Sequence, residues 1–245
     1  IKRTAIYTEY LSKKAQKSGL YSDVLNDEFI NYLCKAAPLH DIGKIGVADT
    51  ILNKPGKLTN EEYSIIKTHP VIGADIIKGV ELIAYTEDVA RYHHERYDGK
   101  GYPCGLKGEE IPFYARIVAV ADSYDAMNSK RIYRKSLSKE IIRSEIEKNK
   151  GLQFDPQIAD TFLELFDSGE LELNENDANS PELNGNIDNT NVSDAEQMIS
   201  AVMNTIRTNV EGTSHDFLTG LMLRNKGETE ICKKMVETTG VLLFF

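Results

Sequence analysis

Four of the five histidines in this 245-residue chain lie between positions 40 and 94, and each has a neighbour suited to a metal site. With the aspartates that accompany them, the candidate ligands are His40, Asp41, His69, His93, His94 and Asp122. Imidazole and carboxylate are typical ligands of Zn, Mn or Fe, and several histidines with a bridging aspartate suit more than one ion. Burying six such groups without a metal would be costly. The pattern therefore predicts a metal centre.

Phosphodiester hydrolysis is the reaction class that such a centre favours. Two ions bridged by Asp41 would activate a water near neutral pH and would neutralise the charge that grows on a phosphate. Asp41 is therefore a candidate catalytic residue, and so is Lys44, which follows it by about one turn and could reach the same phosphate. Arg131 and Arg134 could clamp a second phosphate, because guanidinium groups match it in a bidentate way. The alternative for all three basic residues is an ordinary solvated role.

A glycine-rich loop follows the adjacent histidines directly. Glycine is needed where the backbone turns tightly or comes close to a ligand. A simple break after a helix would explain one glycine, but less easily the three at positions 99, 101 and 105. We therefore expect substrate contacts from Gly101, Tyr102 and Pro103, with the Tyr102 ring a candidate for stacking on a base.

Apolar residues at helical spacing predict that the first 166 residues form an all-α domain. The expected helices cover residues 1–17, 27–41, 59–69, a stretch that starts at Pro70, 87–95, 113–127, 138–149 and 155–166. In this arrangement His40 and Asp41 lie at the inner end of the second helix. His69 ends the third helix, and His93 and His94 occupy the last turn of the fifth. No convincing alternating strand pattern occurs before residue 166.

The composition changes after residue 166. Residues 167–192 are rich in Asn and acidic residues, which is typical of a flexible linker. Residues 193–213 are expected to form a connecting amphipathic helix, whose apolar seam over 193–210 could pair two copies of the chain or pack on its own domain. Residues 214–245 read as a turn, a helix and the start of a buried strand.

Charge and cysteine content narrow the class of protein. The net charge is -9, but residues 151–206 hold twelve of the 38 acidic residues and no Lys or Arg, so the rest of the chain carries +3. That balance fits a phosphate-bearing substrate and is too weak to predict duplex nucleic-acid binding. Three widely spaced cysteines argue for a reducing compartment. No apolar run approaches the roughly 20 residues of a spanning helix. We expect a cytoplasmic protein, with any sensor or membrane segment upstream.

Several motifs together resemble the HD-GYP family of cyclic dinucleotide phosphodiesterases. They read LHDIGKI at 39–45, KPGKL at 54–58, HHERYDGKGYP at 93–103 and ADSYDA at 121–126, with a His-Pro pair at 69–70 and an Ile-Pro pair at 111–112. The resemblance implies an all-helical fold, two or three Fe or Mn ions, and cleavage of cyclic di-GMP to pGpG or GMP. It implies that the six candidate ligands bind metal and that Lys44, Arg131 and Arg134 hold phosphate. The family segment begins with a histidine that would stand just before Ile1, and three-metal members add a glutamate further upstream.

The end of the chain resembles the opening of a GGDEF domain, the diguanylate cyclase fold. The resemblance rests on DFLTGLMLR at 216–224 and GVLLFF at 240–245, about 30 residues that stop before the signature loop. It implies a GGDEF partner in cis, coupled through the connecting helix.

Two alternatives to a cyclic di-GMP phosphodiesterase stay open here. One is a cyclic-dinucleotide-binding signalling module with poor turnover, and the other is a phosphodiesterase for another cyclic dinucleotide such as cyclic GMP-AMP.

Overall fold

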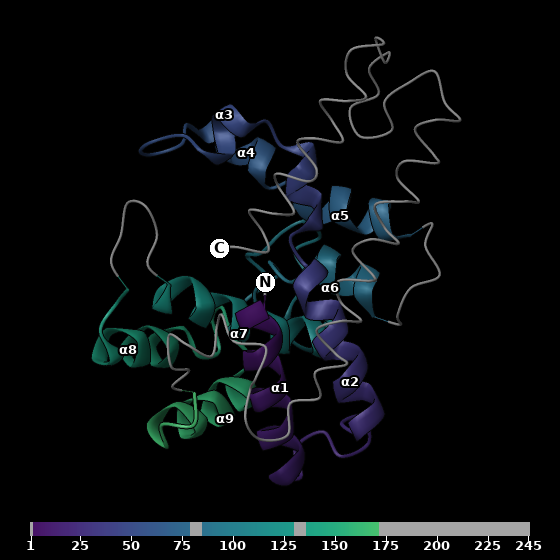
Figure 1. The fold of residues 1–245 in the computed structure, drawn as a ribbon, viewed down its shortest axis with the longest axis vertical. Coiled ribbons are helices and arrows are strands. Elements are labelled where there is room, and N and C mark those ends of the chain that lie inside the picture. The colour runs from purple at the N-terminus through teal and green to yellow at the C-terminus, as the bar shows by residue number, and fades with distance from the viewer. Residues whose placement is uncertain (1, 79–84, 130–135, 172–245) are drawn as a thin grey trace.

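A computed structural model describes residues 2–78, 85–129 and 136–171, which form an all-helical domain without β-strands (Figure 1). The α-helices are α1 (Lys2–Lys17), α2 (Asp27–Ala36), α3 (Asp49–Leu52), α4 (Asn60–Ile66), α5 (His69–Ile77), α6 (Thr86–Tyr92), α7 (Phe113–Asn128), α8 (Lys139–Asn149) and α9 (Pro156–Asp167). Three short 3-10 helices are η1 (Ala37–Leu39), η2 (Ile42–Gly46) and η3 (Gly108–Glu110). The predicted all-α fold is confirmed for this part of the chain. The expected linker, connecting helix and GGDEF-like fragment lie almost wholly outside the described residues.

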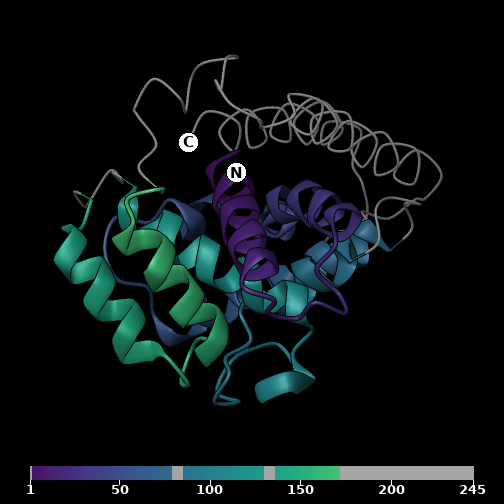
Figure 2. The ribbon, with the colours of Figure 1, turned by 90° about the horizontal axis from the view of Figure 1, so that it is seen from below.

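The core of the domain forms around α1, which packs against α2, α7 and α9 (Figure 2). Tyr7 and Leu11 of α1 are almost fully buried, and so is Phe162 of α9. The ring of Tyr124 on α7 lies 4.6 Å from the Tyr7 ring and 5.2 Å from that of Phe162. Burial of such large apolar side chains supplies most of the free energy that favours folding. The helices that carry the candidate ligands are thus fixed to one shared core.

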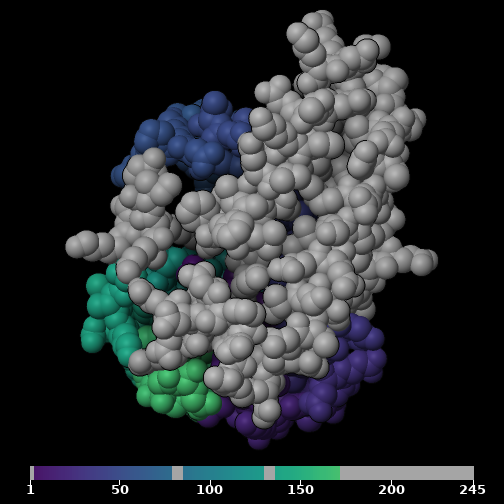
Figure 3. Space-filling model, viewed as in Figure 1, coloured from purple at the N-terminus to yellow at the C-terminus, as the bar shows by residue number. Residues whose placement is uncertain are grey.

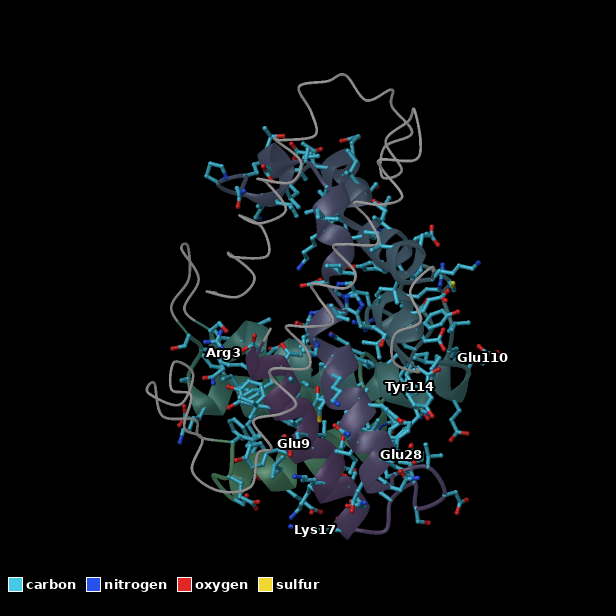
Figure 4. The ribbon with its side chains drawn as sticks, turned by 45° about the vertical axis from the view of Figure 1, so that its right-hand side comes forward. Arg3, Glu9, Lys17, Glu28, Glu110 and Tyr114 are labelled. Atoms are coloured by element: carbon cyan, nitrogen blue, oxygen red, sulfur yellow. The ribbon has the colours of Figure 1, made fainter. Side chains whose placement is uncertain are left out.

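Polar contacts between helices set the place of α7, which carries Asp122. Arg3, near the start of α1, donates from Nε to the Oδ1 of Asp125 over 2.7 Å (Figure 4). Tyr114, labelled on the opposite flank in Figure 4, donates its hydroxyl hydrogen to Asp88 of α6. These contacts join both ends of α7 to neighbouring helices, so they determine where Asp122 lies relative to α1 and α6.

Several predicted helix boundaries are confirmed by their caps. Asn26 accepts a hydrogen bond from the backbone N–H of Phe29 at the start of α2. Thr59 and Glu62 form the predicted capping box of α4, in which each side chain accepts from the backbone of the other. Asp155 caps α9 by accepting from two backbone N–H groups. Such caps satisfy the N–H groups that the first turn of a helix leaves without partners.

Three predicted boundaries near the histidines are wrong. The second helix ends at Ala36 rather than Asp41, because Pro38 has no N–H for α-helical bonding and the chain tightens into η1. His69 is the first residue of α5 and does not end the helix before it. The helix expected over residues 87–95 ends at Tyr92, so His93 and His94 follow it. In each case the histidine lies at a junction between elements.

Helices α3 and α4 project from the body of the domain as a separate knob (Figures 1 and 3). These two helices contact each other, and the chain returns from them to the core at Thr68 and His69. The exposed fraction is 47% for Tyr63 and 44% for Ile65, both on α4.

Across the described residues, no helix combines the length and apolar character needed to cross a membrane.

Candidate metal centre

Asp41 lies at the middle of the centre and faces two groups of ligands with its two oxygens. Its Oδ2 lies 3.3 Å from the Nε2 of His40, and that Nε2 lies 3.4 Å from the Oδ1 of Asp122. Its Oδ1 lies 3.3 Å from the Nε2 of His69 and 3.8 Å from that of His93. A carboxylate placed in this way can bridge two ions, one on each side.

Backbone carbonyls hold three of the histidines in one tautomer. The Nδ1 of His40, His69 and His93 lies 2.6, 2.7 and 2.9 Å from the carbonyl oxygen of the residue three positions earlier in each case. A carbonyl can only accept, so each Nδ1 must carry the hydrogen and donate it. The lone pair on each Nε2 is then free to point into the centre, which is the arrangement that metal-binding histidines normally have.

His94 completes the second group and is held by ring contacts. Its ring centre lies 4.1 Å from that of His93, and the Tyr102 ring stacks on it at 4.8 Å. Asp41, His69, His93 and His94 each offer one ligand atom, and these four atoms all lie within 4.8 Å of one another. This set is a compact three-nitrogen, one-oxygen group suited to a divalent transition metal.

The electrostatics of the centre show strong competition between burial and charge. Burial alone would lower the pKa of His40, but the carboxylates of Asp41 and Asp122 more than offset it and raise that pKa to about 10. Burial lowers the pKa of His94 to about 2, assisted by the neighbouring histidines. Burial disfavours the ionised form of Asp41, yet His40 and Lys44 hold its pKa well below the usual range. The carboxylates are therefore ionised and ready to bind a cation.

The buried Nε2 of His40 has no hydrogen-bond partner of good geometry within the described part of the chain. A buried polar atom left in this way normally costs about 1–3 kcal/mol. A divalent cation that displaced the proton of the charged ring would receive the Nε2 lone pair and would also offset the negative charges of Asp41 and Asp122. The donor set and this orphaned nitrogen therefore both fit a bound metal ion.

A close backbone contact brings the two halves of the centre together. Gly43 of η2 packs so tightly on α5 that a Cβ atom there would lie 1.9 Å from the carbonyl oxygen of His69 and 2.4 Å from the nitrogen of Gly73. No side chain fits in that space. The sequence shows Gly43 only as part of an irregular stretch, while the structure shows that it allows His69 to approach Asp41.

Glu95 is a buried residue of the region that the sequence interpretation missed. Its Oε1 accepts hydrogen bonds from the backbone nitrogens of Cys104 and Gly105 at 2.7 and 3.1 Å, and its Oε2 accepts one from Leu106 at 3.1 Å. The side chain is only 3% exposed. The sequence did contain a signal for Glu95, because this glutamate directly follows two histidines and precedes a loop whose backbone N–H groups need acceptors. Glu95 holds the far side of the glycine-rich loop.

The three residues of the glycine-rich loop that were predicted to contact substrate lie in different surroundings. A Cβ at Gly101 would lie 2.3 Å from the backbone nitrogen of Arg96, so Gly101 packs against its own loop. Tyr102 lies between His94 and the surface, and Pro103 follows it through a cis peptide bond. The structure thus brings Tyr102 to the edge of the centre and gives Gly101 a packing role.

Lys44 contacts the centre directly, because its Nζ lies 2.5 Å from the Oδ2 of Asp41. This ion pair joins the side of Asp41 that faces His40. The side chain of Lys44 is 34% exposed, so its ammonium group lies at the boundary between the centre and solvent. Arg131 and Arg134, the other predicted phosphate ligands, lie outside the described residues.

The helical fold and this arrangement of histidines and aspartates define the class of protein. Residues 2–158 match the family described as HD domain, and the chain belongs to this family.

Relatives with curated names extend the comparison. A probable cyclic di-GMP phosphodiesterase of Vibrio cholerae is 41% identical over 169 residues, which are 66% of this chain and 38% of that protein. The 3'3'-cGAMP-specific phosphodiesterase 2 of the same organism is 37% identical over 169 residues, 68% of this chain and 31% of that protein. The crystal structure of a cyclic GMP-AMP specific phosphodiesterase of V. cholerae matches with a TM-score of 0.53 at 18% identity, covering 81% of this chain and 53% of that one. The last match shows a shared fold. The chain spans well under half the length of these two curated relatives.

Proposed function

We propose that this chain is the catalytic part of a metal-dependent phosphodiesterase that hydrolyses cyclic di-GMP to pGpG or GMP. The observation that carries the proposal is the position of Asp41, with one oxygen facing His40 and the other facing His69 and His93. The name of the 41% identical V. cholerae relative supports the substrate.

The six predicted ligands would divide into two groups that share Asp41. His40 and Asp122 form one group, and the remaining three histidines form the other. Divalent ions, for which we propose Fe or Mn, would supply an activated water and neutralise charge on the phosphate. Asp41 holds the two groups at a fixed separation, and the tautomers set by the backbone keep each Nε2 aimed inward.

Residues around the centre would hold the rest of the substrate. Lys44 can move from Asp41 to a phosphate oxygen, since it is partly exposed and bears a positive charge. Arg131 and Arg134 remain the proposed clamp for the second phosphate. Tyr102 would border the substrate from the glycine-rich loop, with Gly101 and Pro103 shaping the loop beside it.

The test is turnover of cyclic di-GMP by the protein loaded with Mn or Fe under anaerobic conditions. Linear pGpG or GMP should appear, and Asp41→Asn should abolish the reaction while leaving the helical circular dichroism unchanged. A matched control is Asp75→Asn, which changes an exposed carboxylate on α5 away from the centre. Turnover that survives Asp41→Asn would refute the role of Asp41. Tight binding of cyclic di-GMP without any product would instead favour a signalling module with poor turnover.

Cyclic GMP-AMP is a second candidate substrate, because one of the relatives is named for 3'3'-cGAMP. Measuring kcat/KM for both dinucleotides side by side decides between them.

We also propose that the parent protein is cytoplasmic, carries the GGDEF-like domain in cis and pairs through the helix over residues 193–210. Light scattering on chains with and without residues 193–245 tests the pairing.

A further inference from the structure

A cluster of two tyrosines and a lysine lies between the metal centre and the surface. Tyr63 comes from α4, Lys67 directly follows α4, and Tyr102 comes from the glycine-rich loop. The Nζ of Lys67 lies 4.7 Å from the centre of the Tyr63 ring and 5.7 Å from that of the Tyr102 ring. Tyr102 stacks on His94, so the cluster continues directly from a candidate metal ligand.

The charge of Lys67 is not neutralised by a neighbour. In the part of the chain that the structure describes, no carboxylate forms an ion pair with it, and its ammonium group is held by the faces of the two rings. Lys44, the other lysine near the centre, is already paired with Asp41. Lys67 therefore supplies an unpaired positive charge beside the site. An anion that reached the centre past α4 would meet it.

The Tyr63 ring is available for stacking. Its exposed fraction is 47%, on a helix that projects from the body of the domain. An exposed aromatic ring beside a cation is the combination with which proteins hold nucleotides without reading their sequence, because every base has a flat face and every nucleotide a phosphate. Phosphate alone would not need the ring, and a purely apolar ligand would not need the lysine.

We propose that Tyr63 and Lys67 form a subsite for the half of the substrate that is not being cleaved. Lys67 is a further cation for the second phosphate of a cyclic dinucleotide, in addition to the arginines proposed above, and Tyr63 stacks on the adjoining base. This inference rests on the proposed function, and it adds one residue of α4 and the residue that follows this helix to the substrate-binding surface. It also gives the projecting knob of α3 and α4 a role in holding substrate.

The first experiment compares two substrates in single variants of the Mn-loaded chain. Tyr63→Leu should raise the KM for cyclic di-GMP about fivefold to hundredfold, the range that loss of one stacked base produces. Lys67→Met should raise it at least about tenfold, because it removes a charge-assisted contact to phosphate. Neither change should alter kcat/KM for methyl 4-nitrophenyl phosphate, a small diester with no second phosphate. Tyr63→Phe keeps the ring and should bind like the unchanged protein. Lys57→Met, which removes an exposed lysine before α4, is the matched control.

The second experiment detects binding without turnover. The chain contains no tryptophan, so Tyr63→Trp introduces a single indole at the proposed stacking position. Stacking of guanine should quench its fluorescence during titration with cyclic di-GMP, in metal-free as well as loaded protein. Inorganic phosphate should leave the fluorescence unchanged.

The outcomes separate this inference from the proposed function. If the unchanged chain cleaves cyclic di-GMP while Lys67→Met keeps the same KM and the indole is not quenched, the subsite is refuted and the enzyme stands. If nothing is cleaved but quenching occurs and is weakened by Lys67→Met, the subsite stands and the enzyme is refuted. Equal quenching by inorganic phosphate would overturn base stacking by Tyr63.

Discussion

Replacing Glu95 by glutamine should destabilise the domain through the glycine-rich loop. The substitution keeps the shape of the side chain but removes its charge and turns one of its two acceptor oxygens into a donor. If the amide nitrogen of the glutamine faces Leu106, the backbone N–H of Leu106 loses its acceptor and lies opposite another donor. The hydrogen bonds from Cys104 and Gly105 then end on a neutral oxygen instead of a charged one and become weaker.

The magnitude follows from these three bonds. A hydrogen bond to a charged group contributes about 1.5–3 kcal/mol and a neutral one about 0.5–1.5 kcal/mol, while an orphaned buried N–H costs about 1–3 kcal/mol. A neutral side chain is less costly to bury, which returns part of the loss. We therefore expect the free energy of unfolding to fall by about 2–4 kcal/mol, less than the total stability of a typical domain.

Urea unfolding followed by circular dichroism measures this loss in Glu95→Gln. The control is Glu109→Gln, which removes an exposed carboxylate from the same loop and should leave the midpoint unchanged. The KM for cyclic di-GMP should also rise, because Tyr102 depends on the loop for its position against His94. A stability within about 0.5 kcal/mol of the unchanged protein would refute the reasoning, since surface substitutions alone produce changes of that size.

Three further predictions concern the centre and the core. Gly43→Ala should push α5 away from η2, because the added Cβ would lie 1.9 Å from the carbonyl oxygen of His69. Calorimetry should then show Mn binding weakened at least tenfold. The metal-free chain should be most stable near pH 6.5 in urea unfolding. The raised pKa of His40, about 10, gives stability that is complete below 6.5 and lost as pH rises toward 10, whereas the lowered pKa of His94, about 2, makes stability fall as pH drops below 6.5. A flat profile would contradict both shifts. Arg116→Met should cost about 3–5 kcal/mol because it removes the cation that neutralises the buried carboxylate of Asp155. Arg143→Met removes one partner of an exposed ion pair and should have no measurable effect.

The sequence was sufficient to predict the helical class, and the structure places the six candidate ligands close together, while their role as metal ligands stays a prediction. Residue type and spacing carry that information, because a histidine beside an aspartate on an apolar face has few inexpensive alternatives to binding a metal. The positions of His40, His69 and His93 at element junctions were not predicted. Helical periodicity reports which face is buried, and it does not report where Pro38 or a tight turn ends the helix.

The close contacts of the site could not be predicted, for a related reason. Gly43 and Gly73 come from elements 30 residues apart, and the lack of space between them is a property of the packed structure. Glu95 likewise gains its partners only when residues 104–106 fold back over it. The pairing of Lys67 with Tyr102 arises from a similar return of the chain. Local sequence patterns contain no direct signal for such contacts.

The carbonyl groups that hold His40, His69 and His93 have a consequence for how this site tolerates change. Each imidazole takes its orientation from the main chain of its own turn, so no other side chain has to be retained for that purpose. Substitutions at Ala37 or Ile66 that preserve the backbone path should leave the ligands correctly aimed. The orientation of these three ligands is therefore a property of the short junction segments themselves.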